Sequence, residues 1–236
     1  MLTKMYLTNF MSFKERTAFD FTASKYSILE KTNVSGGTLK GALLIGPNAS
    51  GKSNVLKGLA FIIKMIKGEG ASFFSYRCFF SKNPITILEY EFLFDGKEVK
   101  YVIEYNMETK SISENLKIDD ITVLQRNGNK GELRLGDNIT TDDQLDSQTL
   151  FLRTASFNTG RFPQEPTLRQ LMDFLQNSYI IDGYNMGATY GNAITKYAEE
   201  YGVDKINKYL DEFNYDFVVE YGSESEGADL KVIVGS

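Results

Sequence analysis

The segment Gly46-Pro47-Asn48-Ala49-Ser50-Gly51-Lys52-Ser53 constrains this chain more than any other part of the sequence. It fits the G-x-x-x-x-G-K-S pattern of a phosphate-binding loop, which joins a buried strand to the start of a helix. The apolar run 42–45 predicts that strand, and the apolar spacing over 54–66 predicts the helix. The order of strand, loop and helix indicates an α/β fold with a nucleoside triphosphate site.

The residue types in this loop explain what it can bind. Gly46 and Gly51 lack a Cβ, so the backbone can bring its N–H groups close to phosphate oxygens. The helix that begins near Lys52 directs the positive end of its dipole at the phosphates. Lys52 can reach the β- and γ-phosphates, and the Ser53 hydroxyl can ligate Mg²⁺. Lys52 is therefore the candidate catalytic residue and Ser53 the candidate metal ligand.

Composition excludes several classes of chemistry. The chain has no histidine, which removes Ser-His-Asp triads and histidine zinc sites. Its one cysteine, Cys78, cannot form an internal disulfide and is expected to be a small buried hydrophobe. The net charge of −5 does not indicate nucleic-acid binding through bulk charge, although a local basic patch stays open. No apolar run approaches the roughly 20 residues of a membrane span, and a reducing cytoplasm is the expected location.

The first 135 residues alternate mainly like strands. Residues 3–10 and 17–21 predict two strands before the phosphate loop, with Met5, Leu7 and Asn9 on one face. After a helix that ends at Gly68, the runs 88–94 and 99–105 predict a hairpin that turns at Asp95-Gly96. Further strands are expected at 111–118 and 122–126. The expected parts are an N-terminal segment with the phosphate loop at 1-70 and an antiparallel β-subdomain at 71-135.

The rest of the chain changes character from about residue 141. Helical patterns cover 142–152, 167–177, 192–201 and 203–213, which places a helical segment at 136-214. In the last of these helices the stripe Ile206, Tyr209, Leu210 and Phe213 favours a core position over a partner surface. Residues 215–221 and 228–234 predict a β-hairpin at 215-236.

Two stretches resemble a known family. The pattern Leu7-Thr-Asn-Phe-Met-Ser-Phe13, followed by the region from Leu39 through the phosphate loop to Leu59, resembles the N-terminal lobe of ABC-type ATPase heads. Such heads occur in SMC and double-strand-break-repair ATPases and in AAA-family ATPases of abortive-infection and OLD-like anti-phage systems. The anti-phage group is the closer match, since the segment from Phe79 to Tyr105 also resembles its β-subdomain. The resemblance is strong over residues 1 to 66 and weak from 70 to 234.

This resemblance implies a fold, a ligand and partners. The fold is an α/β P-loop NTPase lobe with a mixed sheet, an antiparallel β-subdomain and a helical segment. ATP and Mg²⁺ are the implied cofactors, and ATP is held between two heads, so a homo-oligomer is implied. An effector nuclease is a further implied partner, and nucleic acid is reached through the complex. The implied nucleotide-binding residues are Gly46, Pro47, Asn48, Ala49, Ser50, Gly51, Lys52, Ser53, Asn54 and, toward the base, Ser12. Where related heads carry a basic residue before that serine, this chain has Met11, and Lys14 is the candidate substitute.

Several motifs of these heads are missing from the sequence. There is no signature segment, no switch histidine and no strand ending in Asp-Glu. The run that ends at Asp95-Gly96 is interpreted as a hairpin turn, and the run that ends at Asp182-Gly183 lacks the following glutamate. The γ-phosphate-sensing glutamine stays open among Gln125, Gln148 and Gln164. We therefore interpret the chain as an N-terminal lobe, with the remaining motifs supplied by a C-terminal lobe of the same protein.

Two other interpretations stay open. A self-contained P-loop kinase or GTPase requires a Mg²⁺-binding aspartate and a lid rich in arginine, for which Arg153, Arg161 and Arg169 are candidates. A non-hydrolysing scaffold would use its nucleotide structurally. The long β-rich segment that precedes the phosphate loop argues against the kinase interpretation, because small-molecule kinases usually carry that loop after their first strand.

Overall fold

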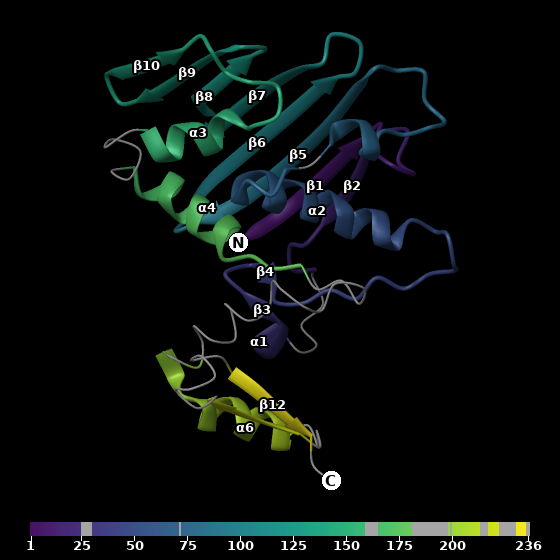
Figure 1. Ribbon diagram of the computed structural model, residues 1–236, viewed down its shortest axis with the longest axis vertical. Helices are drawn as coiled ribbons and strands as arrows, with labels where there is room; N and C mark the ends of the chain where they lie inside the picture. The colour runs from purple at the N-terminus through teal and green to yellow at the C-terminus, as the bar shows by residue number, and fades with distance from the viewer. Residues whose placement is uncertain are drawn as a thin grey trace. The chain divides into compact units, whose positions relative to one another are not determined.

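A computed structural model describes residues 1–24, 30–70, 72–158, 165–180, 198, 200–212, 217–221 and 230–234. It divides into an N-terminal unit, Met1–Ser178, and a C-terminal unit, Tyr179–Ser236. Figure 1 shows the elements of both units. None of the described helices combines the length and apolar character that a bilayer crossing requires.

The N-terminal unit is built on one eight-stranded sheet with the order β10-β9-β8-β7-β6-β5-β1-β2. All of its described pairings are antiparallel. The strands expected as a separate subdomain thus continue the sheet that β1 and β2 begin. Their bounds are β1 Leu2–Thr8, β2 Thr17–Asp20, β5 Ile85–Phe94, β6 Lys97–Asn106, β7 Ser111–Ile118, β8 Ile121–Asn127, β9 Lys130–Leu135 and β10 Asn138–Asp142.

Alternating burial explains why these segments form one sheet. In β5 every second residue is buried, and the same period continues through β7. The β5–β6 hairpin turns at Asp95 and Gly96, whose φ angles are 48° and 82°, as the Asp-Gly signal predicts. Met5, Leu7 and Asn9 are all buried, so the predicted face of β1 is confirmed.

Three helices lie over one face of this sheet (Figure 1): α2 Lys52–Lys67, α3 Phe151–Asn158 and α4 Pro166–Gln176. The predicted helices at 54–66 and 167–177 are therefore confirmed. Gly58 lets α2 approach β1 closely, because a Cβ there would lie 2.9 Å from a methyl carbon of Leu7. The hydroxyl of Tyr90 donates to the Gly58 carbonyl at 2.7 Å, which fixes α2 on the buried side of the sheet. Gly68 ends α2 with φ 77°, as predicted.

The remaining described elements of this unit are short: α1 Glu30–Asn33, β3 Val34–Ser35, β4 Thr38–Leu39 and the 3₁₀ helix η1 Phe73–Tyr76. The strands β3 and β4 pair with each other and not with the large sheet. Cys78 follows η1 and is buried, as expected from the sequence.

Two predictions for this unit are wrong. The apolar run 42–45 is not a strand, and the side chains of Leu43 and Ile45 are 83% and 84% exposed. The large sheet offers it no place next to β1, because β5 and β2 already occupy both edges of that strand. The expected helix 142–152 is also wrong, since β10 ends at Asp142 and α3 begins only at Phe151. The side chain of Asp146 accepts from the N–H groups of Gln148 and Thr149, which stabilises a turn before α3.

The C-terminal unit contains α6 Val203–Glu212 and the antiparallel strands β11 Phe217–Tyr221 and β12 Leu230–Val234. The helix predicted at 203–213 and the terminal hairpin are confirmed, while most of the helix predicted at 192–201 lies outside the described residues. The expected core stripe on α6 is wrong for Tyr209, which is 48% exposed, and Phe213 is outside the described residues. A polar contact holds α6 to β11 instead: the Asn207 amide exchanges two hydrogen bonds with the backbone of Val219.

Candidate phosphate-binding site

The phosphate loop leads into the N-terminus of α2. Ala49 and Gly51 have positive φ angles of 62° and 95°, and Gly51 is the residue that precedes the first turn of α2. A loop with these turns exposes backbone donors. The N–H groups of Asn48, Ala49, Gly51, Lys52 and Ser53 have no acceptor among the described residues. Such a row of free N–H groups, reinforced by the helix dipole, fits the oxygens of a phosphate chain.

The side chain of Lys52 closes the loop on itself. Its Nζ donates to the carbonyl oxygens of Gly46 and Pro47 at 2.7 and 2.6 Å. The ammonium group therefore lies within the loop, where it donates to two backbone carbonyl oxygens. The same atom can turn from these neutral acceptors to phosphate oxygens, because an ammonium group binds a negatively charged oxygen more strongly than a neutral carbonyl oxygen.

The turn between β1 and β2 contacts the loop from the side. Asn54 Nδ2 donates to Ser12 Oγ at 3.0 Å, which links the first turn of α2 to that β-turn. A Cβ on Gly51 would lie 2.9 Å from the same Ser12 oxygen and 3.4 Å from the ring of Phe13. Ser12, Gly51 and Asn54 are thus brought together, although they come from two distant parts of the sequence. Lys14 is exposed in the same turn.

Mg²⁺ would be held through Ser53. This residue is exposed in the first turn of α2, and its hydroxyl makes no hydrogen bond with any described residue. The free hydroxyl oxygen can bind a hard cation such as Mg²⁺. The free N–H groups beside it can bind the phosphate to which that cation bridges. Where the sequence is described, no group of three or more acidic or cysteine side chains forms a further metal centre.

The structure separates the other sequence candidates from this loop. Gln125 is exposed on β8 between the buried residues Leu124 and Arg126, so it lies on the sheet face opposite α2. Gln148 belongs to the turn before α3, and Gln164 lies outside the described residues. Asp95 is part of the β5–β6 turn and accepts from Gln170, which confirms the hairpin interpretation. Asp182 and Gly183 lie outside the described residues.

The arginines of a hypothetical kinase lid also lie elsewhere. Arg153 donates to the carbonyl oxygen of Ile66 at 3.3 Å, at the end of α2 that is opposite to the phosphate loop. Arg169 forms an exposed ion pair with Asp173, one helical turn away on α4. Arg161 lies outside the described residues. A lid over the phosphates therefore gains no support from Arg153 or Arg169.

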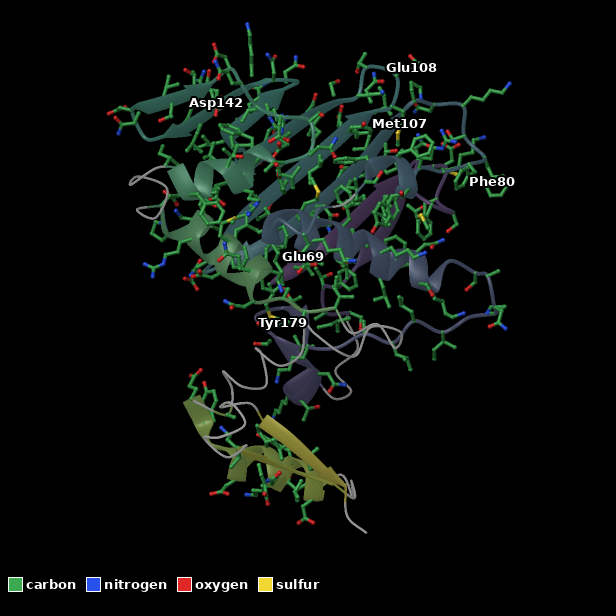
Figure 2. The ribbon with its side chains drawn as sticks, in the orientation of Figure 1. Glu69, Phe80, Met107, Glu108, Asp142 and Tyr179 are labelled. Atoms are coloured by element: carbon green, nitrogen blue, oxygen red, sulfur yellow. The ribbon has the colours of Figure 1, made fainter. Side chains whose placement is uncertain are left out.

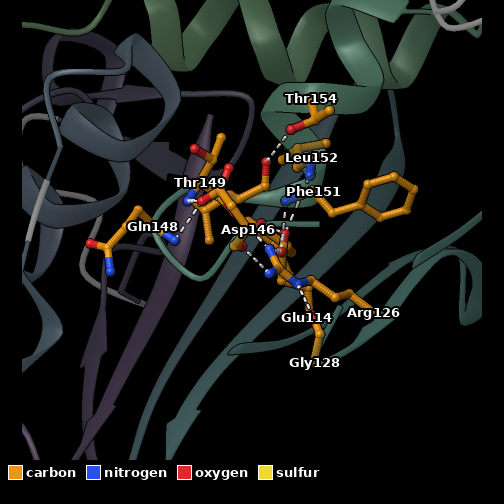
Figure 3. A network of polar contacts seen from close by, with 11 residues as sticks. Glu114, Arg126, Gly128, Asp146, Gln148, Thr149, Phe151, Leu152 and Thr154 are labelled. Carbon is orange, nitrogen blue, oxygen red and sulfur yellow. Dashed lines mark hydrogen bonds and ion pairs between the residues drawn. The ribbon is translucent and has the colours of Figure 1, made fainter. Parts of the chain in front are cut away.

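Sequence reasoning missed a buried ion pair, which Figure 3 shows in its surroundings. Glu114 on β7 and Arg126 on β8 are direct cross-strand partners, with Arg126 Nη1 3.2 Å from Glu114 Oε1. Both side chains are almost completely inaccessible. The alternation of buried and exposed positions in β7 and β8 contained a hint of this pair, because Glu114 and Arg126 both occupy buried positions of that pattern. Predicting their partners required the register of two strands.

This ion pair holds α3 against the sheet. Glu114 accepts from the N–H groups of Phe151 and Leu152 at 2.7 and 3.3 Å, so it caps the first turn of α3. Arg126 donates to the carbonyl oxygens of Thr149, at 2.6 Å, and Asp146. Burial raises the pKa of Glu114, although its hydrogen bonds from Tyr101 and Phe151 and the charge of Arg126 oppose that shift. The pair is therefore a structural element of the fold.

The fold and the loop together define a P-loop NTPase domain: an antiparallel-dominated sheet covered by helices, with a phosphate-binding loop before α2. The family described as "AAA domain, putative AbiEii toxin, Type IV TA system" matches residues 42–165, which is more than half of the chain. The chain belongs to this family of AAA domains, and its function is that of an AAA-type, nucleotide-binding P-loop domain. No curated protein gives a significant match.

Proposed function

We propose that this chain is the ATP-binding lobe of an ABC/SMC-like ATPase and that ATP is held in a composite site between two such heads. The observation that carries the proposal is the group of N–H donors of Asn48, Ala49, Gly51, Lys52 and Ser53, which have no acceptor among the described residues and lie at the start of α2. The contact between Asn54 and Ser12 ties this loop to the β1–β2 turn. This arrangement can bind a triphosphate with backbone dipoles alone, before any side chain is added.

Two side chains then complete phosphate binding, and a third positions the neighbouring turn. The Lys52 ammonium exchanges its two carbonyl acceptors, on Gly46 and Pro47, for oxygens of the β- and γ-phosphates. Mg²⁺, held through the Ser53 hydroxyl, would neutralise negative charge on the same phosphates. Asn54 fixes Ser12 beside the loop, which orients the β1–β2 turn toward the base end of the nucleotide.

The exposed run at 42–45 supports a composite site. Leu43 and Ile45 have strand-forming, apolar side chains, yet both are more than four-fifths exposed directly before the phosphate loop. Apolar side chains at such a position gain free energy when another segment covers them. We propose that a second ATPase lobe, from the rest of the same protein, covers this run and supplies the residue that activates water.

The biological setting is part of the same proposal. The family's description names a toxin of a toxin–antitoxin system. Together with the resemblance of the loop region to anti-phage ATPases, this supports a cytoplasmic ATPase in a defence or DNA-transaction complex. An effector nuclease is the proposed partner of that complex, and nucleic acid is its proposed target.

The experiment compares hydrolysis with binding. We expect Mg²⁺-dependent ATP binding by the 236-residue chain but hydrolysis near background, because the water-activating half of the site is supplied from outside it. Addition of an ATPase lobe that carries the signature segment and an Asp-Glu strand should restore turnover. Robust hydrolysis by the chain alone would contradict the composite site and leave the phosphate-loop assignment intact.

A further inference from the structure

The segment 72–84, which follows α2 and leads into β5, combines aromatic side chains and cations on the surface. Phe74, Phe79 and Phe80 are 57%, 72% and 84% exposed. Figure 2 shows Phe80 projecting outward from its loop. Exposed phenylalanines gathered in one short segment are unusual for a surface that faces only water, and they indicate a surface that contacts another molecule.

Two cations accompany these rings. The Arg77 guanidinium lies 4.2 Å from the ring centroid of Phe74 and 5.1 Å from that of Phe79. Neither Arg77 nor Lys82 forms an ion pair with a described residue. Residues 70–88 contain no aspartate or glutamate, although the chain as a whole carries 31 acidic residues. The positive charge of this segment is therefore available to an anionic ligand.

The backbone that presents these side chains is anchored in the core. Phe73 is buried and stacks on Tyr105 with 4.3 Å between the ring centroids, while Tyr76 stacks on Phe10. The N–H of Cys78 donates to the carbonyl oxygen of Asn9 at 3.2 Å. Because Phe73, Tyr76 and Cys78 anchor the segment, the backbone that carries the exposed rings is held in place before any ligand binds. Such preorganisation lowers the entropy cost of binding.

A pocket beside the rings has unsatisfied polar atoms in its walls. Asn9, Arg77, Phe79 and Lys82 contribute to its lining. Asn9 is 2% exposed, and its Oδ1 has no hydrogen-bond donor among the described residues; Arg77 Nε likewise has no acceptor there. An unpaired buried polar atom costs roughly 1–3 kcal/mol. Both residues line this pocket, so a polar ligand that enters it would give the two atoms partners.

We propose that this aromatic and cationic surface, Phe74, Arg77, Phe79, Phe80 and Lys82, binds single-stranded nucleic acid. Its bases would stack on the exposed rings, and its phosphates would pair with Arg77 and Lys82. Stacking platforms flanked by cations are the general solution for binding single strands without reading their sequence. The adjacent turn carries both Glu108 and Lys110, so it adds no net charge. This surface shares no residue with the phosphate loop, and the inference does not rest on the proposed function.

Fluorescence anisotropy tests the proposal with labelled oligothymidylate and oligouridylate of about 20 nucleotides and with a duplex of the same length. We expect the single strands to bind more tightly than the duplex, and the two sugars to show whether DNA or RNA is preferred. The double variant Phe79→Ala/Phe80→Ala should weaken single-strand binding by about 5- to 100-fold for each base contact that is lost. Arg77→Gln should lower the slope of log affinity against log salt by roughly 0.7 for the one phosphate contact removed.

Phe157→Ala is the matched control, because Phe157 on α3 is also an exposed ring, 67% accessible, with the Arg153 guanidinium 5.0 Å from its centroid. It should leave single-strand binding unchanged. Circular dichroism checks that each variant folds. The proposal is overturned if the wild-type chain binds no single strand at low salt, or if the double variant binds as well as the wild type. It is also overturned if the double variant changes only the sedimentation of the protein, which would identify the rings as a protein interface.

Discussion

The amide of Asn54 donates a hydrogen bond to the hydroxyl of Ser12 across 3.0 Å, although 42 positions separate the two residues in the chain. This contact joins the first turn of α2 to the turn between β1 and β2. It also leaves little room beside Gly51, whose missing Cβ would lie 2.9 Å from the same hydroxyl oxygen. The geometry of the phosphate loop therefore depends on a turn that is distant in sequence.

Replacing Gly51 tests this dependence. In Gly51→Ala the new methyl group meets Ser12 Oγ, and the residue keeps a left-handed conformation that costs about 1–2 kcal/mol. We expect a loss of ATP binding together with that loss of stability. Gly36→Ala is the control, because Gly36 also has a positive φ, of 56°, but nothing lies within 4 Å of its added Cβ. It should lose similar stability in thermal unfolding and keep ATP binding; equal ATP binding by both variants would contradict the role of Gly51.

The buried arginine should matter far more than an exposed one. Arg126→Gln removes the positive charge that pairs with Glu114 in the interior and the guanidinium donors to the carbonyl oxygens of Thr149 and Asp146, so we expect a loss of about 3–5 kcal/mol in urea unfolding. Arg16→Gln removes an exposed pair with Glu89, whose Nε–Oε1 distance is 2.7 Å, and should cost about 1 kcal/mol or less. Similar losses in both variants would show that the Glu114–Arg126 pair does not hold α3.

The same pair predicts a pH dependence of stability. Because burial raises the pKa of Glu114 above its ordinary value of 4.5, the folded state binds a proton more tightly than the unfolded state. The contribution of this carboxyl group is therefore complete below pH 4.5 and declines as the pH rises through the raised pKa. We expect the difference in unfolding free energy between wild type and Glu114→Gln to become smaller as the pH rises through the raised pKa of Glu114. Urea unfolding at several pH values measures it, and a difference that grows with pH would refute the assignment.

Substitutions in the exposed run 42–45, before the phosphate loop, should have little effect on the stability of this chain. Leu43→Ser/Ile45→Ser should change the unfolding free energy of this chain by about 0.5 kcal/mol or less, because both side chains are already in water. Leu7→Ala, at a fully buried position on β1, should cost about 2–5 kcal/mol. If the double serine variant is strongly destabilised, the run is packed in solution and cannot be the surface that a second lobe covers.

Local patterns predicted most of the described elements. The Asp95-Gly96 turn, the helix that Gly68 ends and the buried face of β1 all follow from signals within a few residues. The strand at 42–45 could not be predicted in the same way, because an apolar run forms a strand only where a neighbour offers a free edge. The helix expected from residue 142 failed because Asp146 stabilises a turn there through its own side chain.

In the candidate site too, local features could be predicted from the sequence, while contacts between distant segments could not. The phosphate loop itself was recognisable from eight consecutive residues, while the contact between Ser12 and Asn54 needed the fold to bring β1 beside α2. Likewise, the partnership of Glu114 and Arg126 depends on the register of β7 and β8. Side-chain contacts between distant segments are set by tertiary packing, and a local sequence pattern does not show which distant residues will meet.

Calorimetric titration of ATP in the presence of Mg²⁺ tests the central claim most directly. Lys52→Ala removes the ammonium group that we expect to move from Gly46 and Pro47 to the phosphates. Lys57→Ala removes an exposed lysine from the same helix and serves as the control. We expect the Lys52 variant to lose about 10-fold or more in affinity, since a hydrogen bond to a charged group contributes roughly 1.5–3 kcal/mol, and the Lys57 variant to bind like wild type. Equal ATP affinity in all three proteins would contradict the assignment of this loop as the nucleotide site.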